Sequence, residues 1–374
     1  MKMIVRNSFF TVFHTDSEIL FAIISNHLMN DSILKLYLSL PQFCIKQNRK
    51  EIIKLSRLDF AVSITAFTKY NYMTHIKDFE VIIIGGSYAG LSAAMALGRS
   101  LRSVLIIDGG LPCNRQTPHS QNFITHDGEK PGEIAKKAKA DVLKYDTISF
   151  LHGTAISGKK NEDGFTIHIQ SGKEFHAKKL IFATGISDTM PDIKGFAACW
   201  GISVIHCPYC HGYEFRNKNT GILANGARGF HLASMVDNLT DKLTVLTNSK
   251  VDFTEEQTIK IKKHNIEIIE TTITAIEHEK GKVRNVVFAD GSTKSFDALY
   301  ASLPFTQHSN IPASLGCEIN EQGYIKVSPF QETNISGVYA CGDNSNMMRS
   351  LANAVYAGNL TGAAVNGKLV EETF

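Results

Sequence analysis

Two cysteines separated by two residues are the part of this sequence best suited to chemistry. Cys207 and Cys210 stand in the segment IHCPYCHGYE, with His206 and His211 beside them. Such a pair can open and close a disulfide when one sulfur is an accessible thiolate and the other lies within bonding reach. A zinc site is the alternative, but it needs four ligands and this segment supplies three at most. The pattern therefore favours disulfide exchange over metal binding.

The histidine after the second cysteine adds a proton carrier. His211 follows Cys210 directly. An imidazole has an ordinary pKa of about 6.5, so it can accept and return a proton near neutral pH. We predict that His211 deprotonates an incoming thiol or protonates a departing thiolate. A surface histidine on a turn is the alternative that the position leaves open.

Composition places these residues in a globular protein. The 374 residues are 43% hydrophobic and 20% charged, with a net charge of +3, and no apolar run approaches the length of a membrane span. Neither the charge nor its distribution suggests a nucleic-acid footprint. The seven cysteines are scattered along a long chain and do not form the framework of a small secreted domain. We therefore expect a cytoplasmic protein.

The first 72 residues differ from the rest of the chain. They contain no glycine, whereas residues 73–374 contain all 28, and their net charge is +4 against −1 for the remainder. Met73 begins a stretch that reads like an ordinary protein start. We predict that residues 1–72 are an extension outside the fold. A start codon assigned too far upstream would explain it, and a genuine leader is the alternative.

From residue 79 the pattern alternates between buried strands and helices. Continuous apolar runs such as FEVIIIGG and SVLIID are typical of parallel strands that are covered on both faces. Helical stretches separate them, which predicts doubly wound α/β domains. Signatures of a dinucleotide-binding fold occur twice, near residues 79 and 220.

The first glycine motif predicts a nucleotide site. Gly85, Ser87 and Gly90 occupy the three positions of G-x-G-x-x-G, where they allow a tight turn, close approach of a pyrophosphate and packing of the following helix. Serine in the second position is a departure, but its hydroxyl can reach a phosphate oxygen. Asp108 ends the next strand, 18 residues after Gly90, where an acid should accept ribose hydroxyls. A tight turn without a ligand is the alternative.

Two later segments indicate a flavin. LIFATG, which ends at Gly185, and TNISGVYACGD, which ends at Asp343, resemble the second and third signatures of flavoproteins with two dinucleotide domains. The order GGSYAG, ATG, CPYC, a degraded glycine motif and ACGD resembles the thioredoxin reductase family, the class II pyridine nucleotide-disulfide oxidoreductases, over residues 78–372. The segment CNRQTPHSQNFITHDG, from Cys113, is similar to a branch that includes the dithiol oxidases acting on gliotoxin and holomycin.

The resemblance implies a fold of class α/β with two Rossmann-like, three-layer ββα domains. It implies a split FAD-binding domain, residues 73–188 plus 300–374, and an inserted NAD(P)-type domain, residues 189–299, that carries the cysteine pair. It also implies a homodimer.

The resemblance further implies roles for single residues. Cys210 would face the flavin, and Cys207 would exchange with the substrate, which is a small dithiol or disulfide or a thioredoxin-like protein. The FAD contacts that we predict are Gly85, Gly86, Ser87, Tyr88, Ala89, Gly90, Asp108, Asn114, Arg115, Thr184, Gly185, Gly342 and Asp343.

The second glycine motif is degraded. It is formed by Ala224, Gly226 and Gly229, so the glycine of the tight turn is missing. A reductase that prefers NADPH would place arginines after the next strand, but this chain has Thr247, Asn248, Ser249 and Lys250 there. Each lost charge-assisted hydrogen bond is worth roughly 1.5–3 kcal/mol. NAD(P)H binding is therefore in doubt.

Three functions stay open at this point. In the first, a dithiol reduces the cysteine pair, which passes electrons to FAD and then to O₂ or another acceptor. In the second, NAD(P)H reduces FAD and the pair reduces thioredoxin or a small disulfide. In the third, the protein is a flavin-bound redox sensor without turnover. The missing arginines favour the first.

Overall fold

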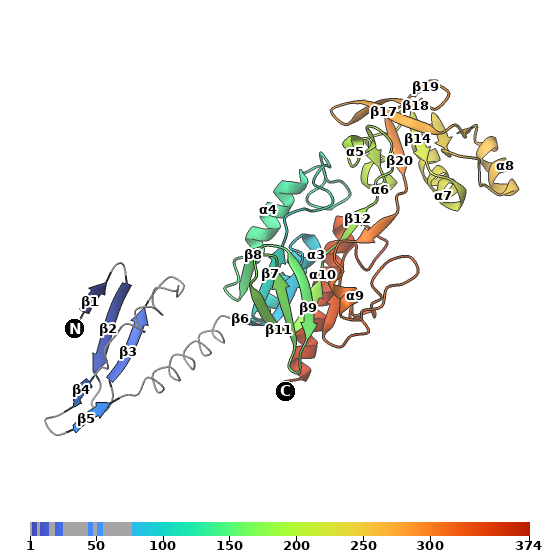
Figure 1. Ribbon diagram of the computed structural model, residues 1–374. Helices are drawn as coiled ribbons and strands as arrows, with labels where there is room; N and C mark the ends of the chain where they lie inside the picture. The colour runs from blue at the N-terminus through green and yellow to red at the C-terminus, as the bar shows by residue number, and fades with distance from the viewer. Residues whose placement is uncertain (1, 6–7, 15–18, 25–43, 48–50, 55–76) are drawn as a thin grey trace. The chain divides into compact units, whose positions relative to one another are not determined.

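The computed structural model describes residues 2–5, 8–14, 19–24, 44–47, 51–54 and 77–374. Contacts divide the chain into two units, residues 1–75 and 76–374. In the first unit, β1 (Lys2–Val5), β2 (Ser8–His14) and β3 (Ile19–Ile24) form an antiparallel sheet, and β4 (Cys44–Gln47) pairs with β5 (Glu51–Lys54) (Figure 1). The predicted boundary at residue 72 lies outside the described residues.

A sheet of seven strands forms the first part of the second unit. Its parallel strands are β6 (Lys77–Ile84), β7 (Val104–Asp108), β8 (Ile148–His152), β11 (Glu174–Phe182) and β22 (Val338–Ala340). Two antiparallel strands, β9 (Ala155–Lys160) and β10 (Phe165–Ile169), extend the sheet beside β11. The apolar runs noted in the sequence are the central strands, which are buried on both faces: Val81 to Ile83 are fully inaccessible to solvent.

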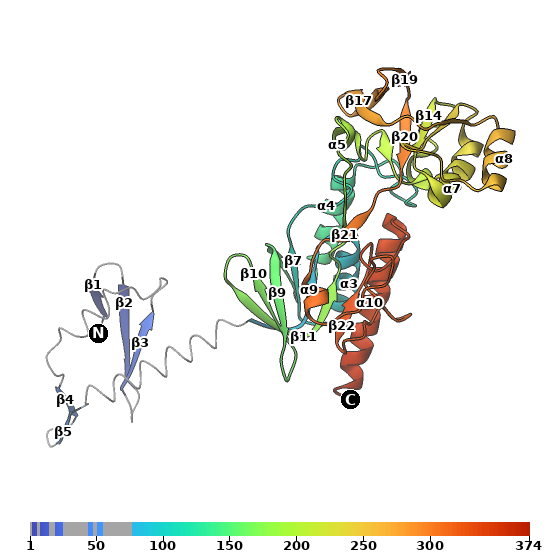
Figure 2. The same cartoon turned by 45° about the vertical axis from the view of Figure 1, so that its right-hand side comes forward.

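Three helices and one short turn cover this sheet: α3 (Tyr88–Arg99), α4 (Pro131–Val142), α9 (Ile311–Ser314) and α10 (Leu351–Glu371). Figure 2 shows α10, in red, running beside α3, and their contact is unusually close. A Cβ on Gly358 would lie 2.1 Å from Ala89 O, and one on Gly362 would lie 2.5 Å from Ala93 O. Glycines along α10 therefore allow its backbone to lie directly against the backbone of α3.

A second parallel sheet has five strands in the order β13-β20-β14-β15-β16. They are β13 (Val204–Ile205), β20 (Ala298–Ala301), β14 (Thr220–Leu223), β15 (Leu243–Leu246) and β16 (Glu267–Ile269). A three-stranded antiparallel sheet accompanies it: β17 (Ile273–Glu279), β18 (Lys282–Phe288) and β19 (Thr293–Ser295). The helical elements are α5 (Phe196–Cys199), α6 (Pro208–His211), α7 (Gly226–Val236), η2 (Asp237–Leu239) and α8 (Glu255–Lys263).

Two short strands join the sheets. The chain passes through β12 (Ile186–Asp188) between the seven-stranded and five-stranded sheets and returns through β21 (Phe305–Gln307), and these strands pair with each other. The predicted α/β class with two Rossmann-like parts is confirmed. The domain boundaries at residues 188 and 300 stay predictions. No helix within the described residues is long and apolar enough to cross a membrane.

Candidate active site

The first glycine turn leads from β6 into α3. Gly85 has φ +105°, and a Cβ there would lie 2.2 Å from Ala183 O. A Cβ on Gly90 would lie 1.9 Å from Gly85 O, so only glycine allows α3 to begin this close to the strand. Ser87 is the N-cap of α3 and its side chain makes no capping hydrogen bond. The hydroxyl and the first N–H groups of α3 are thus open to a ligand.

Asp108 stabilises the turn from the end of β7. Its Oδ1 accepts a hydrogen bond from the Gly86 N–H at 2.8 Å, and its Oδ2 accepts one from the Gly110 N–H at 3.1 Å. A Cβ on Gly86 would lie 2.8 Å from the Asp108 Cβ. The predicted ribose acid therefore also holds the shape of the glycine turn. Its contact with a ribose stays a prediction.

A cavity of about 810 Å³ extends from this turn to the cysteine pair. The predicted site residues that line it are Gly85, Gly86, Ser87, Tyr88, Ala89, Asp108, Asn114, Thr184, Gly185, Cys210, His211, Gly342 and Asp343. Gly90, Arg115 and Cys207 are not among its lining residues. Arg115 is exposed and its Nη1 donates to Pro112 O at 3.2 Å, so its predicted flavin contact has no support in this geometry.

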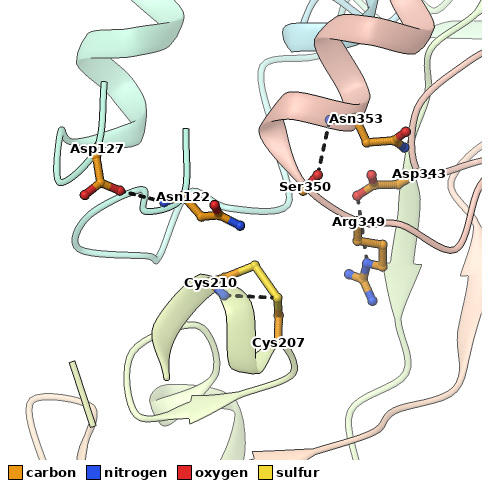
Figure 3. Close-up of a disulfide and its surroundings, with 8 residues drawn as sticks. All are labelled: Asn122, Asp127, Cys207, Cys210, Asp343, Arg349, Ser350 and Asn353. Atoms are coloured by element: carbon orange, nitrogen blue, oxygen red, sulfur yellow. Dashed lines mark hydrogen bonds and ion pairs between the residues drawn. A yellow bond between two sulfur atoms is a disulfide. The ribbon is translucent and has the colours of Figure 1, made fainter. Parts of the chain in front are cut away.

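The cysteine pair forms a disulfide at the start of α6. The Cys207 and Cys210 Cα atoms are 5.3 Å apart, and the Cys210 N–H donates to the Cys207 Sγ at 3.2 Å. Pro208 occupies the first helical position, where its missing N–H costs nothing. Figure 3 shows the surroundings of the disulfide, which include Asn122, a cavity-lining residue that the sequence did not single out. Among the described residues, no cluster of three or more His, Cys, Asp or Glu side chains could hold a metal ion.

The two histidines beside the pair differ in their surroundings. Burial, with a smaller effect of Arg349, lowers the pKa of His206 to about 4, so this imidazole stays neutral at physiological pH. Burial also lowers the pKa of His211. His211 is thereby biased toward the neutral form, which can accept a proton from a thiol. Both histidines line the cavity.

A charged cluster lies beside the pair and was missed by the sequence analysis. Arg349 makes two hydrogen bonds with Asp188, Nη1 to Oδ1 at 2.9 Å and Nη2 to Oδ2 at 3.0 Å, and its Nε lies 3.8 Å from the Asp343 Oδ2. Burial raises the pKa of Asp343, and Arg349 opposes that rise. A single arginine among small and apolar residues, NSNMMRSLANAV, was the available signal.

The free cysteine Cys113 also lines this cavity. The Cys113 Sγ lies 3.9 Å from the Asp343 Oδ2. Desolvation by the surrounding protein is the larger cause, and the Asp343 carboxylate the next, of a rise in the pKa of Cys113 to about 11. The side chain nevertheless faces the open cavity. The raised pKa favours the protonated thiol near neutral pH, unlike that of a thiol prepared for exchange.

The cavity fits an elongated dinucleotide such as FAD. It has a glycine turn that excludes a Cβ, free helix N–H groups at one end and the disulfide at the other. Two buried lining atoms, His206 Nε2 and Arg349 Nε, have no hydrogen-bond partner within the described part of the chain. Unused polar groups of this kind indicate that a polar ligand completes the site.

The second glycine turn is closed by its own side chains. The Asn225 Oδ1 accepts hydrogen bonds from the Gly226 N–H at 2.8 Å and the Asp252 N–H at 2.9 Å. The Asn225 Nδ2 donates to Lys250 O at 2.9 Å and to the Ser249 Oγ at 3.2 Å. The Asp252 Oδ2 lies 3.3 Å from the position of a Cβ on Gly226. A helix N–H that a pyrophosphate would use is therefore engaged, with a carboxylate beside it.

Two Rossmann-type sheets and a disulfide at a nucleotide-shaped cavity define a thiol–disulfide oxidoreductase. The sequence profile of the pyridine nucleotide-disulphide oxidoreductases matches residues 79–358, and the chain belongs to this family. It is a flavoprotein enzyme of the thioredoxin reductase type that acts on sulfur groups. The predicted family membership is thereby confirmed.

Individual relatives agree with this assignment. The chain is 32% identical over 313 residues to thioredoxin reductase tcpT of Claviceps purpurea, which covers 78% of this chain and 95% of the relative. It is 31% identical over 306 residues to thioredoxin reductase sirT of Leptosphaeria maculans, and the match covers 77% of this chain and 93% of that relative. An oxidoreductase structure from Agrobacterium tumefaciens superposes with a TM-score of 0.74 at 34% identity, and the match covers 79% of this chain and 99% of that structure.

Proposed function

We propose that this protein is an FAD-dependent dithiol oxidase, in which electrons pass from a thiol substrate through Cys207 and Cys210 to FAD and then to O₂ or another acceptor. The observation that carries the direction is the closed second glycine turn. Asn225 takes the Gly226 N–H that would bind a pyridine nucleotide, and Asp252 adds negative charge at the same place. FAD contacts are assigned to the predicted residues that line the cavity.

The chain's own residues can carry out the thiol chemistry. His211 accepts a proton from the substrate thiol, and the resulting thiolate attacks the Cys207 sulfur. The Cys207–Cys210 bond breaks, and Cys210 leaves as a thiolate toward the cavity that it lines. The second substrate thiol then attacks the mixed disulfide, which releases an oxidised substrate and leaves both cysteines reduced. FAD, when bound, supplies the two-electron acceptor that allows the pair to close again.

An NAD(P)H-dependent disulfide reductase is the second candidate. The five-stranded parallel sheet around β14 and α7 retains a Rossmann form, and the curated relatives carry the name thioredoxin reductase. In this function, thioredoxin or a small disulfide would be the electron acceptor. The two candidates differ in one measurable property, which is the donor that reduces the bound flavin.

Anaerobic mixing separates them. We expect a dithiol to bleach the flavin absorbance at least about 100-fold faster than NADPH or NADH, because two missing charge-assisted hydrogen bonds weaken nucleotide binding by that order. Rapid bleaching by NADPH would instead establish the reductase. Bleaching by no donor would point to a flavin-bound sensor without turnover.

A cysteine variant ties the activity to the pair. Cys207→Ser should keep the yellow flavin and lose dithiol oxidation by about a thousandfold or more, because the exchanging sulfur is gone. Cys317→Ser is the matched control, since Cys317 is a buried free thiol that does not line the cavity. Turnover that survives in Cys207→Ser would remove the pair from the electron path.

We also propose a cytoplasmic homodimer. The dimer rests on the family resemblance. The location is supported by four free cysteines, Cys113, Cys199, Cys317 and Cys341, in the described residues, as expected in a reducing compartment. Light scattering of the purified protein and fractionation of the native cell test these two statements.

A further inference from the structure

We propose that Asp188 is a positioning residue whose carboxylate holds the segment carrying the cysteine pair against the cavity wall at the start of α10. This inference deepens the proposed function, because it concerns the relay between the Cys207–Cys210 pair and FAD. Asp188 ends β12, at the point where the chain crosses between the two parallel sheets. One carboxylate there contacts groups on both sides of the crossing.

The first contact is with the start of α10. The two terminal guanidinium nitrogens of Arg349, Nη1 and Nη2, donate to Asp188 at 2.9 and 3.0 Å, which is the bidentate geometry of the strongest ion pairs. Arg349 directly precedes Ser350, whose Oγ accepts the Asn353 N–H at 3.1 Å as the N-cap of α10. Figure 3 shows Arg349, Ser350 and Asn353 together at this helix start. The pair therefore attaches β12 to an element that lines the cavity.

The second contact is with the segment that leads to the cysteines. The Trp200 Nε1 donates to the Asp188 Oδ2 at 3.3 Å. Trp200 forms a bridge with Val204, and its ring centroid is 6.1 Å from that of His206. Val204 begins β13, which runs directly to His206 and Cys207. Asp188 is thereby linked through Trp200 to the segment that leads to the disulfide.

All three side chains of this arrangement are shielded from water. The Asp188 side chain is 7% exposed, that of Arg349 is 15% exposed, and Trp200 is 8% exposed. In such surroundings an ion pair is weakly screened, and removal of one partner leaves an unpaired buried charge. Because Trp200 and Arg349 both donate to Asp188, a movement of one relative to the other would break a hydrogen bond of this carboxylate. The carboxylate therefore opposes such a movement and fixes the segment that carries the sulfur atoms relative to the cavity.

The chain provides its own probe for a test. Trp200 is the only tryptophan, so fluorescence of the FAD-loaded protein reports on this one side chain. Trp200 near the flavin has a short, quenched fluorescence lifetime, and Trp200 away from it has a longer one. We expect Asp188→Ala to raise the ratio of the long-lifetime population to the short-lifetime population about tenfold. Loss of one charge-assisted hydrogen bond changes an equilibrium between two such states by about this factor. Quenching of Trp200 by acrylamide should rise in the flavin-free protein as well. Asp192→Asn, at an exposed carboxylate of the same connection, is the control and should change neither.

Kinetics give an independent measurement. In Asp188→Asn, bleaching of the flavin by a dithiol should slow about tenfold. Reduction of the Cys207–Cys210 disulfide by the same dithiol, measured by titrating the new thiols, should keep its wild-type rate. A residue needed only for folding would lower both rates together through loss of folded protein. Asp188→Glu should recover part of the bleaching rate, since it restores the charge at a longer reach.

The double variant Asp188→Asn/Arg349→Gln covers the case in which a single variant fails to fold. It removes both charges of the Asp188–Arg349 pair, so neither of these two groups stays buried without the other, and it should fold while Trp200 stays unquenched. Wild-type lifetimes and wild-type bleaching in folded Asp188 variants would overturn the inference. So would an equal effect of Asp192→Asn. If dithiols fail to bleach the wild-type flavin, the proposed function falls, and the fluorescence comparison still tests Asp188.

Discussion

The two glycine turns of this chain sit in similar sheets and differ in what their hydrogen-bond donors do. Around Gly85 the turn opens onto the large cavity, and the Ser87 hydroxyl caps nothing. Around Gly226 the Asn225 side chain holds the backbone and joins it to the loop of Lys250 and Asp252. The Ser87 hydroxyl of the first turn thus makes no capping hydrogen bond, whereas the Gly226 N–H of the second turn donates to the Asn225 side chain.

The stability of this second sheet does not depend on the hydrogen bonds of its glycine turn. The second sheet is stabilised by buried apolar side chains of β14, α7 and β15, including Ile222, Ala233 and Val245, which are fully inaccessible to solvent. Burial of such side chains contributes to stability whether or not a ligand binds. The polar loop at the end of the strands is free to change because it contributes little to that core.

The largest effect is expected from a substitution that disrupts the first glycine turn, compared with the equivalent substitution at the second. Gly90→Ala should cost about 3 kcal/mol or more and abolish FAD retention, because the new Cβ would lie 1.9 Å from Gly85 O. Gly229→Ala places its Cβ 2.8 Å from Ala224 O, so it should cost less, about 1 kcal/mol, and keep the flavin. Urea unfolding and the ratio of flavin to protein absorbance measure both. Equal loss of flavin in the two variants would contradict the comparison.

Acid should lower the stability of the folded protein through His206, which lines the cavity beside the cysteine pair. Its pKa in the folded protein is about 4, below the ordinary 6.5, so the unfolded chain binds the proton first and stability is lost as pH falls from 6.5 to 4. The loss attributable to this group is about 3 kcal/mol at the lower pH. His206→Asn should flatten that part of the stability profile. An unchanged profile in His206→Asn would remove the assignment.

A gain of function would sharpen the comparison at the second turn. Asn225→Ala with Asp252→Asn frees the Gly226 N–H and removes the nearby charge, so NADPH should bind about tenfold more tightly. Calorimetric titration measures the affinity. Ser249→Ala is the control, because it leaves the Asn225–Gly226 hydrogen bond in place. No gain in the double variant would mean that another feature closes this site.

The smallest effect concerns the acid of the first turn. Asp108→Asn keeps one oxygen for the Gly86 N–H and loses the charge, so FAD affinity should fall about fivefold. Titration of the flavin-free protein with FAD measures the change. Unaltered affinity would restrict Asp108 to a role in shaping the turn.

Much of the site could be read from spacing alone. The positions of Gly85, Gly90 and Asp108 follow from local geometry, because a strand, a tight turn and a helix are set by residues close in sequence. The C-x-x-C disulfide is local for the same reason. By contrast, Asp188 and Arg349 are 161 residues apart, and no pattern in either segment predicts their ion pair.

The sequence by itself determined the class of fold, the glycine turn and the proximity of the two cysteines, since each depends on neighbouring residues or on the periodicity of buried strands. Only the tertiary structure decided which histidine is shielded enough to remain neutral, that Asn225 closes the second turn, and that Asp188 joins Arg349 to Trp200. Burial and long-range hydrogen bonds depend on which distant segments pack together. No spacing rule along the chain contains that information.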